Sequence, residues 1–98
     1  MGRMTRDELL IKLRELKPWL EEQGIVNVRL FGSYARDEAG PDSDVDLLVD
    51  LVKPMGFRFF GIEEDLTEQV GTKVEMVTNA ALRNPYIRRT AERDALVV

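Results

Sequence analysis

Four residues in the first half of the chain have types and a spacing that suit phosphate chemistry. Gly32 and Ser33 form a pair of small residues, and ten residues later Asp44 and Asp46 flank a single valine. Residues two apart in a strand point to the same side and lie roughly 6–7 Å apart at the backbone. The two carboxylates can therefore converge on one point, beside a glycine that allows a backbone to approach a phosphate closely.

Two carboxylates held this close repel each other and need a cation between them. At ~5 Å and an effective dielectric constant near 20, the repulsion is about 3 kcal/mol. The chain has no histidine and no cysteine, so the available ligands are hard oxygens, which favour magnesium or manganese. We expect two Mg²⁺ ions roughly 4 Å apart, because such a pair stabilises both the attacking and the leaving oxygen in phosphoryl transfer.

A third carboxylate, Glu75, belongs to a later strand pattern and shares the face of the two aspartates if the strands pair in register. We assign Glu75 to the ion that activates the acceptor hydroxyl or to removal of its proton. The Ser33 hydroxyl and the amides that follow Gly32 can donate to a triphosphate. The predicted site thus consists of Asp44, Asp46 and Glu75 as catalytic and metal-binding residues, with Gly32 and Ser33 holding the nucleotide.

The elements that must position these residues alternate between helical and strand patterns. Residues 5–8 have the residue types of a capping box, and leucines at helical spacing follow up to Gly24. Alternating apolar residues and helical spacing then predict the remaining elements: strands over 25–31, 44–51, 73–78 and 95–98, and helices over about 59–70 and 85–93. This order predicts an α/β (α+β) protein with a small mixed sheet and helices packed on one face.

Length and composition narrow the function classes. At 98 residues, with 44% hydrophobic and 33% charged residues, we expect one globular domain spanning 1–98. No segment resembles a membrane span or a secretory signal, and the absence of cysteine fits a cytoplasmic protein. The net charge of -4 argues against direct nucleic-acid binding through phosphate contacts.

The Gly-Ser pair, the ten-residue spacer and Asp44-Val45-Asp46 together resemble the signature of the polymerase-β-type nucleotidyltransferase superfamily. The longer string over residues 32–49 is similar to the minimal nucleotidyltransferase branch, the antitoxin partners of HEPN-domain toxins. The resemblance implies a polymerase-β-like nucleotidyltransferase fold, magnesium on the three carboxylates, and ATP as the substrate held by Gly32 and Ser33. It also implies transfer of AMP from ATP to a hydroxyl, a tyrosine of the cognate HEPN-type toxin.

Two residues depart from the family pattern. Glu75 stands where aspartate is usual and is one methylene longer, while Asp37 stands where glycine is common. The chain also has no second domain for an acceptor, so we expect a partner protein to complete the acceptor site. The alternative function is that of an antitoxin with weak catalysis that neutralises its toxin by stoichiometric binding. The sequence allows either a homo-oligomer or a hetero-oligomer with the toxin.

Several charged residues near these motifs have simpler interpretations. We expect Arg36 to pair with a carboxylate such as Asp42 rather than with phosphate, and Asp50 to be structural. Lys73 is interpreted as a solvated lysine at a strand edge. The late arginines, Arg88 with Glu92 among them, are interpreted mainly as a solvated helix face.

Overall fold

The first helix begins at the capping box that the sequence predicts. The computed structural model describes residues 4–98, and α1 runs from Arg6 to Glu22. The Thr5 hydroxyl accepts a hydrogen bond from the Glu8 amide at 3.1 Å, and the Glu8 carboxylate accepts one from the Thr5 amide at 2.9 Å. The helix continues through Pro18.

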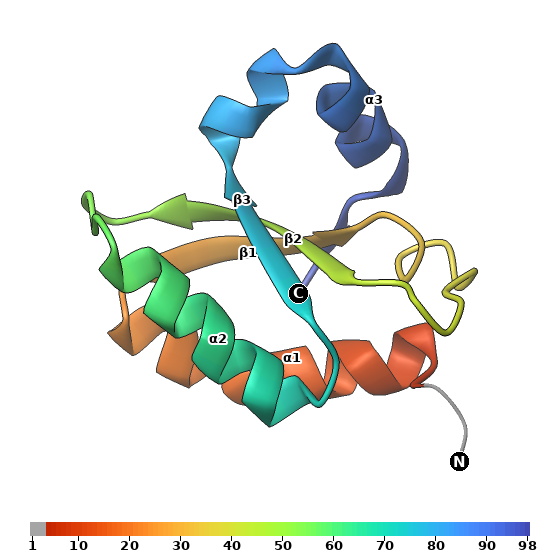
Figure 1. The fold of residues 1–98 in the computed structure, drawn as a ribbon, viewed down its shortest axis with the longest axis horizontal. Helices are drawn as coiled ribbons and strands as arrows, with labels where there is room; N and C mark the ends of the chain where they lie inside the picture. Colours follow the sequence, from red (N-terminus) through yellow and green to blue (C-terminus); the bar gives the residue numbers. More distant parts are fainter. Residues whose placement is uncertain (1–3) are drawn as a thin grey trace.

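Four strands form one mixed sheet, in the order β3-β2-β1-β4 (Figure 1). Their bounds are Ile25–Phe31 for β1, Val45–Leu51 for β2, Val74–Thr78 for β3 and Leu96–Val97 for β4. β1 is antiparallel to both β2 and β4, whereas β2 and β3 are parallel. A parallel pair needs a crossover connection, which α2 (Arg58–Val70) supplies.

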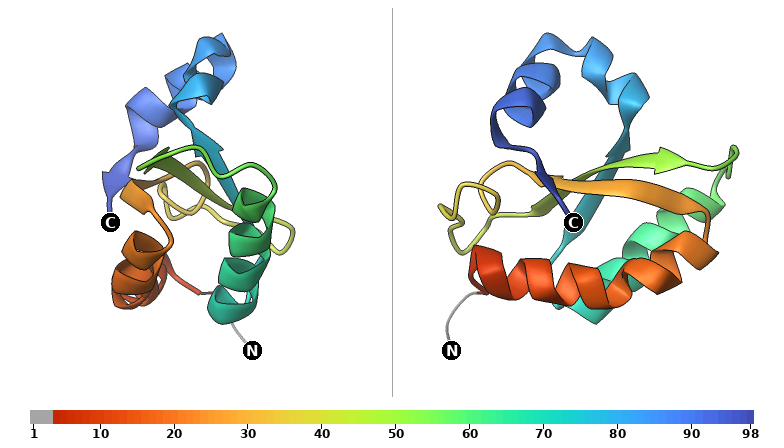
Figure 2. Two further views of the ribbon diagram at one scale, coloured as in Figure 1. Left: turned by 90° about the vertical axis from the view of Figure 1, so that its left-hand side faces the viewer. Right: turned by 180° about the vertical axis from the view of Figure 1, so that it is seen from behind.

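The helices lie on both faces of the sheet, as the two further views show (Figure 2). Helices α1 and α2 cover one face, and leucines of both helices pack there against the inward residues of β1, β2 and β3 in the main core. The short 3₁₀ helix η1 (Asn79–Arg83) and α3 (Pro85–Asp94) cover the other. Within residues 4–98, no helix is both long and apolar enough to cross a bilayer.

The predicted class and mixed sheet are confirmed, but α3 differs from the expectation that the helices share one face. A second apolar cluster joins Phe31 of β1 and Leu48 of β2 to Ala91 of α3, with Val77, Leu82 and Ile87 around them. Leu48 is an apolar residue on the strand face that otherwise carries Asp46 and Asp50. Covering it with α3 removes its surface from water, which is the physical reason for the second layer.

Asp50 ties three elements together at the end of β2. Its carboxylate accepts hydrogen bonds from Asn27 at 2.9 Å, from Arg29 at 3.4 Å and from Asn79 at 2.6 Å. These partners lie on β1 and at the start of η1. The contacts support the prediction that Asp50 is structural.

Candidate active site

The parallel pairing of β2 with β3 brings the acidic residues of the two strands together. Asp46 is directly opposite Glu75 in the register, and Val45 is opposite Val74. Because side chains alternate along a strand, the two valines enter the main core while Asp46 and Glu75 share the opposite face. The predicted meeting of Asp46 and Glu75 on one face is therefore present, and Asp44 lies immediately before β2.

Gly32 directly follows β1 and lies against the carboxylate of Asp46. Its φ of +80° is a left-handed conformation that glycine adopts without steric cost. A Cβ atom placed on Gly32 would collide with Asp46 Oδ2 and would lie 3.3 Å from Asp46 Cγ. The glycine thus serves both the turn of the chain and the close approach of backbone to carboxylate.

The loop between Gly32 and Asp44 is anchored at several points. Tyr34 and Ala35 are buried in the main core. Asp37 has a φ of +58°, and its Oδ1 accepts a hydrogen bond from the Arg6 amide at 3.1 Å. Asp37 thus adopts a left-handed conformation that glycine would also allow, and aspartate tolerates this region better than most residues.

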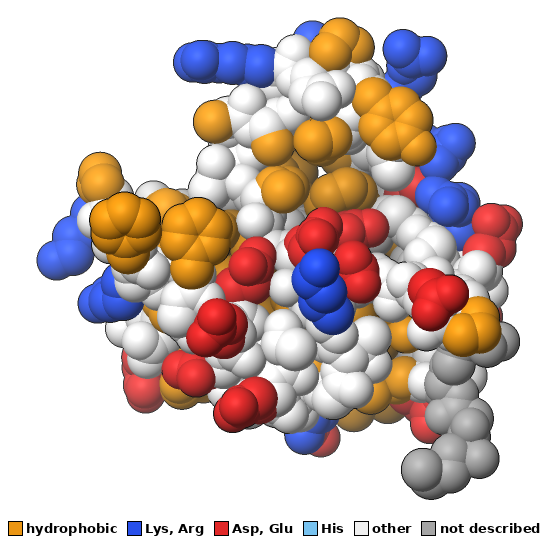
Figure 3. All heavy atoms as spheres, viewed as in Figure 1, with side chains coloured by type: hydrophobic (Ala, Val, Ile, Leu, Met, Phe, Trp, Pro, Cys, Tyr) orange, Lys and Arg blue, Asp and Glu red, His pale blue; other side chains and the backbone are white. Residues whose placement is uncertain are grey.

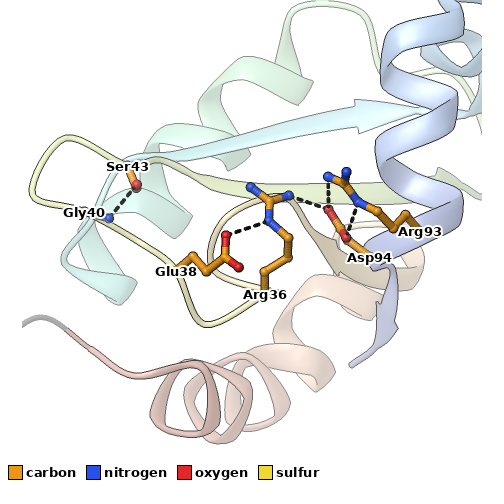
Figure 4. Close-up of polar contacts among 6 residues, drawn as sticks. All are labelled: Arg36, Glu38, Gly40, Ser43, Arg93 and Asp94. Carbon is orange, nitrogen blue, oxygen red and sulfur yellow. Dashed lines mark hydrogen bonds and ion pairs between the residues drawn. The ribbon is translucent and has the colours of Figure 1, made fainter.

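The end of the same loop is held by a turn just before Asp44. The Ser43 hydroxyl accepts a hydrogen bond from the Gly40 amide at 2.8 Å, and the Ser43 amide donates to the Gly40 carbonyl at 3.2 Å (Figure 4). This turn fixes the point at which the chain enters β2.

The electrostatic environment of Asp46 opposes its charge. Burial, followed by the charges of Glu75 and Asp44, raises the pKa of Asp46 from its ordinary value of 3.8 to about 6. The positive charge of Arg36 acts in the opposite direction and is the smallest of these effects. A cation bound beside Asp46 would relieve this repulsion.

Lys73 places a positive charge beside Asp44 and Glu75. Its Nζ lies 3.6 Å from Glu75 Oε1 and 4.0 Å from Asp44 Oδ2. Figure 3 shows acidic side chains gathered around a basic one on this side of the molecule. The expectation of a merely solvated lysine therefore omitted its two acidic neighbours, although its side chain is 66% exposed.

The three carboxylates have the donor chemistry that magnesium prefers, since all are hard oxygen ligands. Within residues 4–98, however, no group of three such side chains is arranged so that it could hold a metal ion. Two of them, Asp44 and Glu75, face Lys73 instead. An ion at this position would have to displace the lysine ammonium.

A cavity of about 390 Å³ adjoins four of the five predicted site residues: Gly32, Ser33, Asp46 and Glu75. Asp44 does not line it. The cavity is also lined by Tyr86, Thr90 and Arg93 of α3 and by Arg36 of the loop after β1. These three α3 residues were not predicted to belong to the site, because no local spacing in the sequence links that helix to the Gly-Ser motif.

Arg36 and Arg93 meet on one buried carboxylate, Asp94. Arg36 Nη1 donates to Asp94 Oδ2 at 2.6 Å, and Arg93 donates through Nε at 2.9 Å and Nη2 at 3.1 Å (Figure 4). Hydrogen bonds from Arg93 and then from Arg36 lower the pKa of Asp94, against the opposing effect of burial. The predicted pairing of Arg36 with a carboxylate is therefore present, but its partners are Asp94 and Glu38 and not Asp42, which was given as the example.

A larger hollow of about 600 Å³ lies elsewhere on the α3 side of the sheet. Leu48, Leu82 and Ala91 form part of its lining, and its one carboxylate, Glu92, is paired with Arg88 at 3.0 Å as predicted. Its lining has no cluster of carboxylates and no glycine. The smaller cavity is therefore the candidate active site.

Comparisons with known proteins agree with this geometry. Residues 9–98 match the family described as nucleotidyltransferase domain. A "Putative protein adenylyltransferase" of Methanocaldococcus jannaschii is 38% identical over 96 residues, covering 96% of this chain and 98% of the relative. Protein adenylyltransferase MntA of Thermococcus cleftensis is 36% identical over 100 residues, covering all of both chains.

Two solved structures share the fold. One, described as a "putative minimal nucleotidyltransferase", has a TM-score of 0.81 at 29% identity and covers both chains fully. The other is a toxin-antitoxin crystal structure with AMP-PNP, with a TM-score of 0.62 at 18% identity over 94% of this chain and 70% of that one. At that identity the second likeness concerns the fold alone.

The family match and the relatives that cover nearly the whole chain define an enzyme class that transfers nucleotides. This chain belongs to the nucleotidyltransferase domain family. The resemblance to its minimal branch is confirmed by the full-length structural match.

Proposed function

We propose that this chain transfers AMP from ATP to a hydroxyl of a partner protein. The observation that carries the proposal is the pairing of Asp46 with Glu75 beside Gly32, at the edge of a cavity large enough for part of a nucleotide. The names of two relatives that match nearly the whole chain, both protein adenylyltransferases, support the choice of nucleotide and of acceptor class.

In this proposal Asp44, Asp46 and Glu75 would hold Mg²⁺, as one or two ions, which requires Lys73 to leave and the three side chains to rearrange from their present positions. When bound, magnesium neutralises charge that develops around the α-phosphate and favours the ionised form of the acceptor hydroxyl. Gly32 lets the triphosphate approach the end of β1, and the Ser33 hydroxyl donates to a phosphate oxygen. Because Glu75 and Asp44 place like charge beside Asp46, a cation bound there would relieve that repulsion.

The reaction is a substitution at phosphorus. The acceptor oxygen forms a bond to the α-phosphorus, the bond from that phosphorus to the β-phosphate oxygen breaks, and pyrophosphate leaves. The hydroxyl proton passes to a carboxylate of the site, for which Glu75 is the candidate. The products are an AMP ester of the acceptor and pyrophosphate.

We further propose that the acceptor is a tyrosine of a HEPN-type toxin and that the modification silences the toxin in the cytoplasm. The chain then acts as an antitoxin. A toxin-antitoxin structure that contains AMP-PNP shares the fold, which supports a toxin and a nucleotide as partners. The tyrosine and the HEPN class rest on the resemblance of residues 32–49 to the minimal nucleotidyltransferases. The partner would complete the acceptor side of the site.

The test is label transfer. The chain is incubated with ATP labelled on the α-phosphate, Mg²⁺ and a HEPN-type toxin from the neighbouring reading frame. We expect the label on the toxin, and its loss with chelator or with Asp44→Asn plus Asp46→Asn. Asp65→Asn on the exposed side of α2 is the matched control. Undiminished labelling by the double variant would contradict the assigned site.

Stoichiometric neutralisation is the second candidate, and the lysine between Asp44 and Glu75 favours it. If the double variant still neutralises the toxin at equal protein ratio without labelling it, binding is the function. If neutralisation requires ATP and fails in the double variant, catalysis is the function.

A further inference from the structure

The side of α2 that points away from the core is apolar at its start and acidic further along. Residues three and four apart share one side of a helix, and the core side of α2 is defined by its buried residues Ile62, Leu66 and Val70. The opposite side, which we call the outer face, consists of exposed residues: Phe57, Phe60, Gly61, Glu64 and Glu68. Figure 3 shows hydrophobic side chains over the start of α2 and acidic ones along the rest of it.

Two phenylalanines are exposed at the start of the outer face. Phe57, which directly precedes α2, is 90% exposed, and Phe60 is 57% exposed. They are three residues apart and are therefore neighbours on the helix surface. Neighbouring exposed aromatic side chains on a small protein indicate a surface that another molecule covers.

The start of α2 also departs from three local preferences of helices. Phe57 is the N-cap residue, where small polar residues are favoured, and its side chain makes no capping hydrogen bond. Arg58 lies in the first turn, which contains no acidic residue, although the helix dipole disfavours a cation there. Gly61 lies within the helix, although a Cβ added to it would meet no atom of the described residues within 4 Å. Such departures from local preference indicate positions that serve a further contact.

An antiparallel copy of α2 would account for these features. Glu64 and Glu68 belong to the later turns of α2, and its last turn contains no basic residue. In an antiparallel pair, the acidic turns of one helix lie beside the uncapped first turn of the other, where carboxylates are favoured. Arg58 and Glu64 are each three residues from Gly61, so a crossing centred on Gly61 brings Arg58 level with Glu64 of the partner subunit. Glycine at the crossing lets the two backbones approach closely.

We propose that the chain forms a homodimer through the outer face of α2, with the two helices antiparallel and crossing at Gly61. The charge pattern selects a second copy, because one face supplies both the basic and the acidic part of the contact. The candidate active site lies on the α3 side of the sheet, whereas α2 covers the other side (Figure 2). The dimer therefore leaves both cavities open, and this interface is independent of the proposed function.

The experiment is sedimentation of the full chain over a range of concentrations. Because two crossing helices bury less surface than a standard interface, we expect a Kd of roughly 1–50 µM. The chain should sediment as a monomer well below this range and as a dimer well above it. A wild type that remains monomeric at about 500 µM would overturn the proposal.

Two substitutions separate the dimer from the stability of the monomer. Phe57→Ser removes an apolar contact, and Gly61→Ala places a methyl group at the crossing, so they should raise Kd about thirtyfold and about tenfold. Neither should lower the unfolding temperature of the monomer, because serine is a better N-cap and alanine a better helix former. Ile11→Ser, at a residue of α1 that is 58% exposed, is the matched control and should leave Kd within about twofold. An unchanged Kd in both outer-face variants would overturn this interface.

A charge exchange tests the antiparallel arrangement. Arg58→Glu and Glu64→Arg each place like charges opposite one another in a homodimer, and each variant alone should associate more weakly than the wild type. An equimolar mixture of the two variants should associate about as strongly as the wild type, because each copy then faces the opposite charge. Failure of the mixture to associate would overturn the arrangement. A chain that is monomeric alone, and whose binding to the toxin is lost in Phe57→Ser, would assign the outer face to the acceptor protein instead and overturn the homodimer.

Discussion

The ionised form of Asp46 is disfavoured in the folded protein, and this affects stability. Its pKa of about 6 lies above the ordinary value of 3.8, which applies to the unfolded chain. Between about pH 4 and pH 6 the folded protein keeps a proton that the unfolded chain has lost. The free energy of unfolding of the metal-free protein should therefore fall as the pH rises through this window.

Asp46→Asn tests this directly, because the amide has nearly the same shape and no charge. In chelator at pH 7 the variant should be more stable than the wild type by about 1–2 kcal/mol, after allowance for solvent screening. The difference should vanish near pH 4. Urea unfolding at a series of pH values measures it, with Asp65→Asn as the exposed control. Equal stability of the variant and the wild type at pH 7 would show that the ionised Asp46 carboxylate does not destabilise the folded protein.

Gly32 can be tested for its close approach as well as for its backbone. Gly32→Ala introduces a Cβ against the Asp46 carboxylate in a left-handed conformation, and should lower the free energy of unfolding by about 2–4 kcal/mol. Gly56→Ala is the matched control, because Gly56 also has positive φ (+61°) but no atom lies within 4 Å of its added Cβ. It should cost only about 1 kcal/mol. An equal loss of stability in both variants would show that the close approach of Gly32 to Asp46 adds nothing to the cost of the left-handed backbone.

At the scale of elements, the hydrogen bonds of Asp50 should stabilise the packing of β1, β2 and η1 on one another. Asp50→Ala leaves three donors without their acceptor and should lower the free energy of unfolding by about 1–3 kcal/mol. Asp65→Ala on α2 serves as control. In a double-mutant cycle with Asn79→Ala, the two substitutions together should cost less than the sum of their separate effects. Additive effects would show that Asp50 and Asn79 do not stabilise the fold through their hydrogen bond.

The sequence predicted most of these elements because their patterns are local. The capping box and the alternation over 44–51 each depend on residues within a few positions, and the structure confirms both. The side of the sheet covered by α3 was not predicted. The available signal was Leu48, an apolar residue between Asp46 and Asp50, whose burial requires a second layer on that face.

The candidate site divides in the same way. The Gly-Ser pair and the two aspartates were found by spacing, and Glu75 by its strand alternation. The contribution of α3 could not be found, because Arg36 and Asp94 are 58 residues apart and only the packing of α3 on Phe31 and Leu48 brings them together. Lys73 was named, but its role depends on the parallel register of β2 and β3.

At the scale of the whole molecule, the uneven charge distribution predicts a response to magnesium. Acidic residues collect around Lys73, in a chain whose net charge is -4. Lys73→Met removes the resident cation, so the chelated variant should unfold at a lower temperature than the wild type. Added Mg²⁺ should raise its unfolding temperature by more than it raises that of the wild type, because the ion no longer competes with the ammonium.

Thermal unfolding with and without Mg²⁺ measures both effects. Lys53→Met, another exposed lysine outside the site, controls for the change in net charge. A magnesium response in Lys73→Met no larger than that of the wild type would mean that the ammonium and the ion do not share a position.

The attachment of α3 at both ends bears on how water is excluded from the active site. The helix follows η1, which packs on β2 and β3, and it leads into β4, which pairs with β1 at Arg29 and Leu30 (Figure 2). A segment secured at each end is poorly suited to fold down over a bound substrate as a flap does. We therefore expect the docked acceptor protein, rather than a movement of this chain, to shield the reacting phosphorus from hydrolysis.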